Sequence, residues 1–288
     1  MTGVRTVEVV ANCASGSVGG GAPAEIEKIL SEQGLTAHVW APEPPDLETC
    51  LRSAIDAAPD LLIVLAGDGT ARLAAELAGP DGPIIAPLPG GTMNMLPHAI
   101  YGQRTWQAAL AIALEHGYAR PIGGGEVDGH SFLVAAILGS PALWAPAREA
   151  ARFGKHRLAW LRARRALRRA FAGRMRYILD GGQREKAEAL IFMCPLTSRA
   201  MDNDEAALEV AALDVRDTLD AFRLGFHALT GDWRDAPGVE MAKSQIGRVW
   251  SAHGIPAILD GESVQLKTLA EIRYTPNVAR ILAIPKDA

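Results

Sequence analysis

Two short apolar runs, each ended by a glycine-rich polar turn, constrain the fold more than any other part of the sequence. Residues 61–65 read LLIVL and lead into AGDGT, and residues 84–88 read IIAPL and lead into PGGTMN. Unbroken apolar runs of this length are typical of strands buried in a parallel sheet. The segment between them has a helical pattern that ends at Gly79. Both turns therefore fall at the carboxyl ends of neighbouring strands, the edge at which open α/β sheets bind ligands.

The residue types in the first turn suit a phosphate group and a metal ion. Gly67 and Gly69 permit backbone conformations closed to other residues and leave room for a phosphate to approach the main chain. Thr70 is expected to cap the following helix, whose free N–H groups favour an anion. Asp68, between the two glycines, is placed to hold Mg²⁺ or a reacting hydroxyl rather than to pack. An ordinary βα turn is the alternative, and the second Gly-Thr turn on a neighbouring strand makes it less favoured.

The rest of the N-terminal half alternates strands and helices. The expected elements are strand 7–11, a helix with Pro23 in its first turn and Gly34 at its end, strand 36–40, a helix that Asp46 caps, and a helix over 105–115. Pro at the start of a helix and Gly at its end are the usual boundary signals. This alternation predicts an α/β domain with a doubly wound parallel sheet.

After Gly117 the pattern changes to strands joined by tight turns. Hairpins are expected over residues 126–138, 174–193 and 255–267, with DG or DGG at each turn. Strands joined in this way predict a second domain built as an antiparallel β-sandwich, with a helical insertion. We place the first domain at residues 1–120, joined by about 276–288, and the second at 121–275.

Positive charge is concentrated in one segment. Residues 148–176 hold eleven Lys or Arg and a single acid, Glu149, although the whole chain carries a net charge of −4. This distribution argues against general nucleic-acid binding and for a local anionic contact. Residues 156–172 are expected to form an amphipathic helix that lies on an anionic membrane surface, or else a solvated helix face on the second domain. The side chains expected at the membrane are Trp160, Arg164, Arg165, Arg168 and Arg169.

The remaining sequence features favour a cytoplasmic protein that associates peripherally with a membrane. No apolar stretch reaches the roughly 18 residues of a spanning helix, and the first residues lack the apolar core of a secretion signal. The three cysteines are scattered and have no metal-ligand spacing. Seven histidines are likewise scattered, and His98, just after the second turn, could reach the cleft, although a place on a helix surface is favoured.

The turns resemble the motifs of a known enzyme family. AGDGT at 66–70 resembles the G-G-D-G-T motif shared by diacylglycerol, sphingosine, ceramide and NAD kinases, and PGGTMN at 89–94 resembles the P-x-G-T-x-N motif of the lipid kinases. NCASG at 12–16 resembles their N-P-x-S-G loop, with Cys13 in place of Pro, and DGE at 260–262 matches their late acidic motif. The chain thus resembles the diacylglycerol kinase catalytic-domain family of the NAD kinase-like superfamily.

The resemblance implies an ATP- and Mg²⁺-dependent lipid kinase whose second domain binds the lipid. Glu262 would act as the base for the substrate hydroxyl across the interdomain cleft, with Asp260 supporting it, and Asp68 would orient Mg²⁺·ATP. In some relatives the Asp of the first motif is itself assigned as the base, so this division of roles stays open. The nucleotide-binding residues implied are Asn12, Ser15, Gly16, Gly67, Asp68, Gly69, Thr70, Gly91, Thr92 and Asn94.

Several positions depart from the family pattern. Ala66 replaces the first Gly of the first motif, and Arg72 and Leu73 stand where many relatives carry Asn-Glu. The segment DEAALEV at 204–210 resembles D-D-G-x-L-D-V, with Ala206 at the Gly. Asp204 stands close to where some bacterial members hold a structural Mg²⁺, which makes it a weak metal candidate. These changes leave the lipid less defined than the phosphate donor, with a slight preference for ceramide or a sphingoid over diacylglycerol.

Two other functions compete with a lipid kinase. An NAD kinase shares the first motif, but it does not account for residues 12–16, 89–94 and 260–262 together. A lipid- or nucleotide-binding relative without turnover is favoured by Arg72, Leu73 and Ala206 and disfavoured by Asp68 and Glu262.

Overall fold

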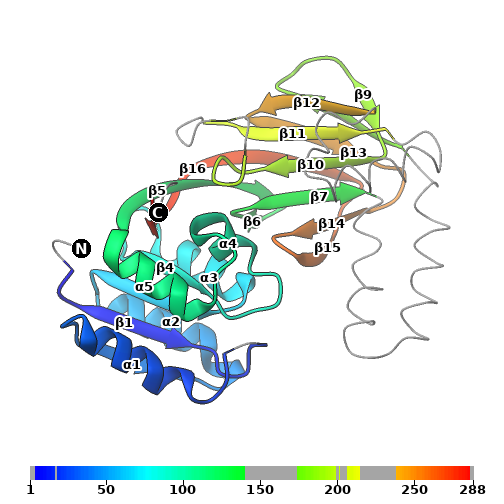
Figure 1. Cartoon of the computed structure of the whole chain (residues 1–288). Coiled ribbons are helices and arrows are strands. Elements are labelled where there is room, and N and C mark those ends of the chain that lie inside the picture. Colours follow the sequence, from blue (N-terminus) through cyan, green and yellow to red (C-terminus); the bar gives the residue numbers. More distant parts are fainter. Residues whose placement is uncertain are drawn as a thin grey trace. The chain divides into compact units, whose positions relative to one another are not determined.

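The computed structural model describes residues 4–16, 18–139, 174–198, 201, 206–214 and 238–285. The chain divides into two compact units, one formed by Met1–Gly123 with Pro276–Ala288 and the other by Gly124–Thr275. Figure 1 shows the element labels used below. The basic segment 156–172, with Trp160, Arg164, Arg165, Arg168 and Arg169, lies outside the described residues, and so does Asp204.

The N-terminal unit is built on a parallel sheet in the order β2–β1–β3–β4–β16. Its strands are β1 (Val7–Ala11), β2 (Ala37–Trp40), β3 (Leu61–Ala66), β4 (Ile84–Pro89) and the end of β16 (Leu269–Ala283). Every residue of β3 is buried, as the apolar run predicts for a central strand with both faces covered. The last strand comes from the far end of the chain, where Ile281 pairs with Ile85.

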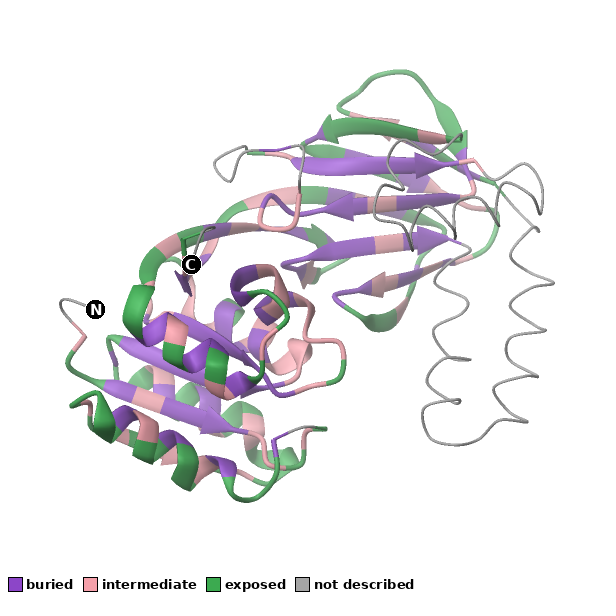
Figure 2. Ribbon diagram, in the orientation of Figure 1, coloured by how far each residue is buried: buried purple, intermediate pink, exposed green. Residues whose placement is uncertain are grey.

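Helices cover both faces of this sheet. They are α1 (Ala22–Glu32), α2 (Leu47–Asp56), which follows the 3₁₀ turn η1 (Pro44–Asp46), α3 (Asp68–Ala78), α4 (Met95–Tyr101) and α5 (Trp106–His116). Gln107 of α5 bonds to Glu25 of α1, which places these two helices on one face. Leu51 of α2 and Ala74 of α3 share an apolar cluster with Val64 of β3 on the other face. The predicted doubly wound sheet is therefore confirmed, and Figure 2 shows its buried strands between half-exposed helices.

The C-terminal unit is an antiparallel β-sandwich, as the hairpin pattern predicts. One sheet has the order β16–β13–β8–β9 and the other β12–β11–β10–β7–β14–β15. Large side chains from both sheets, including Tyr177, Phe192 and Leu259, form one buried cluster. The strands not yet given are β5 (Tyr118–Val127), β6 (His130–Phe132), β7 (Ala135–Gly139), β8 (Met175–Leu179), β9 (Glu185–Ala187), β10 (Ala189–Met193), β11 (Leu208–Leu213), β12 (Val239–Ser244), β13 (Ile246–Trp250), β14 (Ile255–Leu259) and β15 (Glu262–Leu266).

The last of the three expected hairpins forms as predicted, and the first forms only as far as Phe132, because the following strand β7 joins the other sheet. The β5–β6 and β14–β15 hairpins turn at Asp128-Gly129 and Asp260-Gly261, all four at positive φ. The middle expectation, strand 174–179 paired with 187–193, is wrong. Strand β8 pairs with β9, and β10 crosses to the other sheet between β11 and β7. Because residues 189–193 are apolar at every position, their pattern suits a central strand and does not indicate which sheet it joins.

No helix in the described part of the chain is long and apolar enough to cross a membrane.

Candidate active site

Three turns meet at the carboxyl edge of the N-terminal sheet. Asn12, after β1, donates its backbone N–H to Leu65 of β3 at 2.9 Å, and Gly90, after β4, donates to Ala66 at 3.1 Å. A Cβ added to Gly67 would lie 3.8 Å from both Ser15 Oγ and Gly91 Cα. Gly67 and Gly91 lie 52 and 76 positions after Ser15 in the sequence, and the three residues border one small space beside Gly67.

Glycine is required where two of these turns cross. A Cβ on Gly91 would come within 2.7 Å of Gly67 Cα, a distance that real Cβ contacts essentially never show. The second turn is thus packed directly on the backbone of the first. A glycine-lined space at this edge suits a phosphate group, which binds through backbone N–H groups at close approach.

A single residue, Gly67, separates the end of β3 from the start of helix α3. Gly67, in an extended conformation, occupies the N-cap position, and Asp68 is the first helical residue. Thr70 lies within the first turn, where its N–H bonds back to Gly67 at 3.1 Å, so the prediction that Thr70 caps this helix is wrong. Because Gly67 has no side chain, the start of α3 keeps its N-terminal dipole open to an anion.

Asn94 fixes the second turn from within. Its backbone is left-handed, at φ 51°, a conformation that Asn tolerates better than most residues. Its side-chain oxygen accepts the N–H of Gly91 at 2.7 Å, and its amide donates to the Gly91 carbonyl at 3.2 Å. Its own carbonyl accepts the N–H of His98 and so starts α4. Asn94 therefore shapes this turn, whether or not it also touches a ligand.

Asp68 joins the first turn to the helix that follows the second. Its Oδ1 accepts the backbone N–H of Leu96 at 3.0 Å, which caps α4 from outside. Burial raises the pKa of this carboxyl, and the N–H groups of Leu96, Met95 and Asn94 and the charge of His98 oppose that rise. A half-buried carboxylate held at a helix N-terminus in this way remains suited to a metal ion or a phosphate-bound cation.

His98 lies beside Asp68, which fits the less favoured of the two places that the sequence allowed for it. It is half-buried one helical turn after Asn94, and its charge acts on the Asp68 carboxyl. The signal available in the sequence was its spacing of four residues from Asn94, which places both on one side of a short helix.

The late acidic motif forms the turn of the β14–β15 hairpin in the C-terminal unit. Asp260 is only 3% exposed. Its carboxylate accepts the backbone N–H groups of Leu133, Val134 and Ala135 at 2.7–2.9 Å, and its own N–H donates to the Ala135 carbonyl at 3.0 Å. Asp260 thus holds the passage from β6 to β7 against the hairpin.

This geometry separates the two acids of the motif. Asp260 is enclosed by backbone donors and so fixes the turn that precedes Glu262, which is compatible with the supporting role expected from the sequence. Glu262 begins β15 and is exposed. It is the carboxylate of this motif that a ligand in solution can reach.

The other predicted nucleotide residues lie where the turns meet or beside them. Ser15 is half-buried next to Gly67, Gly69 lies in the first turn of α3, and Gly16 and Thr92 are exposed in their turns. Among the described residues, no three His, Cys, Asp or Glu side chains cluster as a metal site would require.

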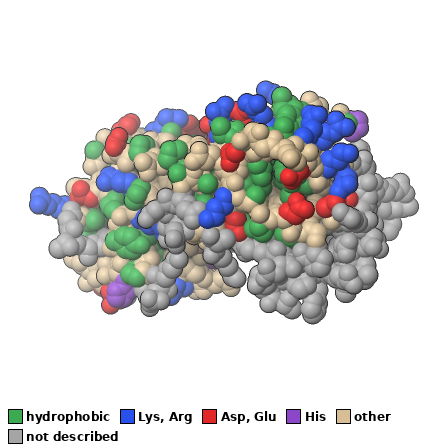
Figure 3. Space-filling view, turned by 90° about the horizontal axis from the view of Figure 1, so that it is seen from above, with side chains coloured by type: hydrophobic (Ala, Val, Ile, Leu, Met, Phe, Trp, Pro, Cys, Tyr) green, Lys and Arg blue, Asp and Glu red, His purple; other side chains and the backbone are tan. Residues whose placement is uncertain are grey.

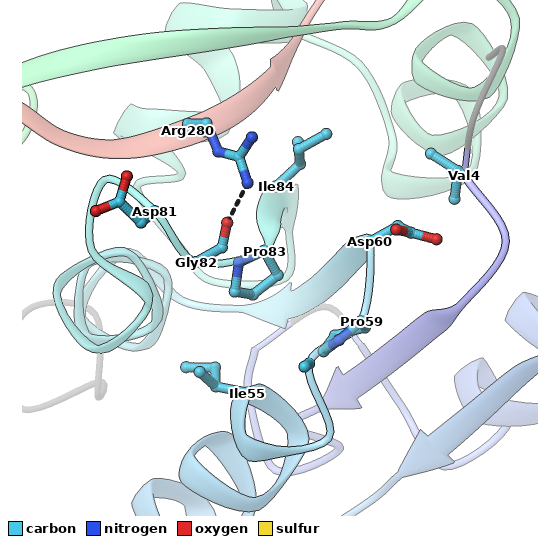
Figure 4. A pocket seen from close by; sticks show the side chains of 10 residues that line it. Val4, Ile55, Pro59, Asp60, Asp81, Gly82, Pro83, Ile84 and Arg280 are labelled. Atoms are coloured by element: carbon cyan, nitrogen blue, oxygen red, sulfur yellow. Dashed lines mark hydrogen bonds between the residues drawn. The ribbon is translucent and has the colours of Figure 1, made fainter.

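A separate hollow of about 450 Å³ lies at the opposite edge of the N-terminal sheet, before β3 and β4 begin (Figure 4). Arg280 of β16 reaches over it and donates to the Gly82 carbonyl. Asp60 borders it too, but its carboxylate accepts the N–H groups of Arg5 and Thr6, which lower its pKa. This hollow is not part of the glycine-lined site.

Comparison with protein families gives the class of domain that the N-terminal part of the chain resembles. Residues 6–126 match the model of the diacylglycerol kinase catalytic domain. This match to the N-terminal part of the chain supports a kinase-type function and confirms the resemblance that the motifs indicate.

Solved structures share the fold over the whole chain. A diacylglycerol kinase from Bacillus anthracis str. Sterne is 16% identical with a TM-score of 0.68, and the match covers 99% of each chain. Another structure from that organism, of a protein proposed to be a diacylglycerol kinase, is 17% identical with a TM-score of 0.74 and the same coverage. Yeast NADH kinase in complex with NADH is 12% identical with a TM-score of 0.52, covering 100% of this chain and 85% of the kinase. No curated protein sequence matches the chain.

Proposed function

We propose that the protein is an ATP- and Mg²⁺-dependent lipid kinase that transfers the γ-phosphate to a hydroxyl of a membrane lipid. The observation that carries this proposal is the convergence of the Ser15, Gly67 and Gly91 turns beside Asp68, within the segment that matches the diacylglycerol kinase domain. Phosphoryl transfer depends mainly on positioning and charge neutralisation, and these are what a glycine-lined edge with one carboxylate supplies.

The residues present fit a nucleotide. The space beside Gly67 is bordered by Ser15 Oγ and by the Gly91 backbone, and the start of α3 faces the same edge. A larger side chain at Gly67 would fill this space, which is why we assign it to the phosphates of ATP. Asn94 contributes by holding the Gly91 N–H and carbonyl in place.

The residues also fit Mg²⁺ delivered with the nucleotide. Mg²⁺ is usually held by one or two carboxylates together with substrate phosphates and water, so a cluster of protein ligands is not required. Asp68 is the carboxylate at this edge, and it would hold the ion. When bound, Mg²⁺·ATP supplies a γ-phosphoryl group whose charge is partly neutralised.

Glu262 is our candidate for the base. It would accept the proton of the lipid hydroxyl as that oxygen bonds to the γ-phosphorus, and ADP would leave with the bridging oxygen. Asp260 acts through the hairpin turn, because its carboxylate fixes the backbone from which Glu262 projects.

The lipid and the cellular location are expectations drawn from the sequence. We propose a ceramide, sphingoid or diacylglycerol substrate, presented by an anionic membrane to a cytoplasmic, peripherally bound enzyme. The basic segment 156–172 would contribute to that contact.

An NAD kinase is the second candidate, because the fold is shared with a yeast NADH kinase. The D-G-E hairpin and the second glycine turn favour the lipid kinase. A relative that binds nucleotide or lipid without turnover is the third candidate.

The deciding experiment measures transfer of labelled γ-phosphate from ATP to a panel. The panel contains diacylglycerol, ceramide, sphingosine and monoacylglycerol in mixed micelles, with NAD in parallel. A labelled lipid establishes the proposed activity and its substrate class. Labelled NAD would assign the chain to the second candidate, and no labelled product with retained ATP binding would favour the third.

A further inference from the structure

The outer face of the β16–β13–β8–β9 sheet in the C-terminal unit combines exposed cations with exposed apolar side chains. Alternation along the strands sets this face, because Met175, Tyr177, Val249 and Ile272 point into the sandwich core. The residues between them point outward. These outward residues are Arg176 and Ile178 of β8, Lys186 of β9, Ile246, Arg248 and Trp250 of β13, and Leu269, Glu271 and Arg273 of β16.

The pairing register brings these side chains into adjacent rows. Arg176 lies opposite both Lys186 and Trp250, and Trp250 lies opposite Leu269. In the next row Ile178 lies opposite Arg248, which lies opposite Glu271. Cations and apolar groups therefore alternate across the face and do not separate into two regions.

Positive charge exceeds negative charge on this face. Five cations (Arg176, Arg184, Lys186, Arg248 and Arg273) stand against two acids, Glu271 and Asp180. Glu271 bonds to Arg248 and Arg273, and Asp180 accepts the backbone N–H groups of Gln245 and Ile246. Among the described residues, no carboxylate pairs with Arg176, Arg184 or Lys186, and the Arg184 guanidinium lies 5.1 Å from the centre of the Trp250 ring. A local excess of this kind stands out in a chain whose net charge is −4.

The apolar members are exposed to an unusual degree for the described part of the chain. Leu269 is 49% and Ile246 38% exposed, and both belong to the short set of large hydrophobic residues that stay accessible. Figure 3 shows hydrophobic side chains among gathered Lys and Arg on the surface it views.

We propose that this face, defined by Arg176, Arg184, Lys186, Ile246, Trp250 and Leu269, docks on an anionic lipid bilayer. Guanidinium and ammonium groups would contact the lipid phosphates while Ile246, Trp250 and Leu269 enter the headgroup region, where an aromatic ring with a polar edge is favoured. This inference rests on the proposed lipid kinase and adds a second membrane contact, on the sandwich itself.

The chemistry of the face favours a bilayer over two other anionic partners. Nucleic acid binds through rows of aromatic rings on which successive bases stack, but Trp250 is the single aromatic side chain among the residues that define this face, and Ile246 and Leu269 are aliphatic. An acidic protein would require a defined, complementary surface. A fluid bilayer accepts interspersed cations and short aliphatic groups without a fixed register.

The test compares vesicle binding by three forms of the full chain, using vesicles of phosphatidylglycerol with phosphatidylcholine and, separately, phosphatidylcholine alone. One variant carries Arg176→Gln, Arg184→Gln and Lys186→Gln. The matched control carries the same charge change on the N-terminal unit through Arg5→Gln, Lys28→Gln and Arg52→Gln. Because each cation near an anionic surface contributes roughly fivefold to partitioning, the first variant should bind about a hundredfold more weakly at low salt. The control should bind like the native chain.

Two additions keep the result decisive. Repeating the comparison in a chain with Arg164, Arg165, Arg168 and Arg169 changed to Gln removes the contribution of the basic segment. The double variant Leu269→Gln and Ile246→Gln removes the apolar part of the contact. A larger share of its vesicle binding should therefore be lost when the salt concentration is raised. Native ATP affinity in every variant shows that the fold is kept.

Equal binding of the first variant and the native chain in both backgrounds would overturn the proposal, and so would binding to an RNA homopolymer in place of vesicles. Vesicle binding requires no turnover, so loss of the proposed kinase activity from the panel assay would not be mistaken for failure of this surface.

Discussion

The Oδ1 atom of Asp68 accepts the backbone N–H of Leu96 at 3.0 Å, across 28 positions of sequence. One carboxylate thereby links the turn after β3 to the helix that follows the turn after β4. Two turns that the sequence presents as repeated motifs are in this way parts of one site. A change at Asp68 acts on both.

Asp68→Asn separates the negative charge of Asp68 from its hydrogen bond to the start of α4. The Asn side-chain oxygen can still accept the Leu96 N–H, but it cannot neutralise a metal ion. We expect turnover to fall about a hundredfold or more, a loss typical of removing one electrostatic contact in the transition state. Steady-state kinetics with the lipid found in the panel measure this. Activity close to native would show that Asp68 acts only as a cap.

The same substitution should not destabilise the fold. The pKa of Asp68 is raised above 3.8, so the carboxyl stabilises the fold when protonated and loses that contribution as pH rises through its raised pKa. At pH 7 the buried, ionised carboxylate therefore lowers the stability of the fold. Asp68→Asn removes that charge and should leave Tm unchanged or higher. Asp68→Ala loses the cap as well and should cost about 1 kcal/mol relative to Asn. A lower Tm for Asn than for Ala would contradict this reasoning.

Gly91→Ala and Gly67→Ala form a matched pair. The new Cβ at Gly91 would lie 2.7 Å from Gly67 Cα, whereas the one at Gly67 would have 3.8 Å contacts. Gly91→Ala should therefore destabilise the protein by about 1–3 kcal/mol through overpacking. Gly67→Ala should keep Tm but weaken ATP binding by about tenfold or more, equal to about 1.4 kcal/mol. Thermal melts and nucleotide titration separate the two effects.

Gly20→Ala serves as the control for this pair, because nothing lies within 4 Å of a Cβ at Gly20. It should change neither property. If Gly67→Ala binds ATP as the native chain does, the space beside Gly67 does not hold the phosphates.

Asn94→Gly tests whether the turn depends on backbone conformation or on the side chain. Gly adopts φ 51° freely but has no side chain to bond to Gly91. Ala also lacks that hydrogen bond, and its Cβ makes the left-handed backbone unfavourable. We expect Asn94→Ala to cost about 2 kcal/mol and Asn94→Gly about half of that. Urea denaturation measures both. Equal losses would mean that the left-handed backbone costs Ala nothing here.

Asp260 and Glu262 should respond in opposite ways. Asp260→Ala leaves three buried N–H groups without their acceptor and should destabilise the protein by about 3 kcal/mol or more. Glu262→Gln changes an exposed side chain and should shift stability by no more than about 0.5 kcal/mol, while the rate falls and ATP affinity stays. Melting curves and kinetics of the two variants, run side by side, check this. A near-native rate for Glu262→Gln would remove it as the base.

Replacement of Arg164, Arg165, Arg168 and Arg169 by Gln tests the basic segment by itself. Each lost cation should weaken binding to anionic vesicles, with the largest effect at low salt because exposed charges are screened at high salt. Sedimentation with vesicles at two salt concentrations gives the answer. Unchanged binding would mean that residues 156–172 do not contact the bilayer.

Local sequence pattern determined most of the N-terminal unit. The short, β-branched-containing apolar run at 61–65 favours a buried strand, and Pro23, Gly34 and Gly79 mark helix boundaries by backbone geometry that a single residue sets. Glycine turns after consecutive strands predicted which loops would lie together at one edge of the sheet. The sequence also predicted the β14–β15 turn, because Asp-Gly favours positive φ at two successive positions.

Tertiary structure decided the rest, because it depends on contacts between distant residues. An apolar strand such as 189–193 fits either sheet of a sandwich, and only packing places it between β7 and β11. The exposed face of the sandwich was likewise hidden in the sequence, since its cations come from four strands and from the turn between β8 and β9. Asp68 and Asp260 each stand beside glycine in a turn, and the sequence does not show which backbone groups they bind. The backbone N–H of Leu96, and those of Leu133 to Ala135, give them different roles, and those donors reach them only when the chain has folded.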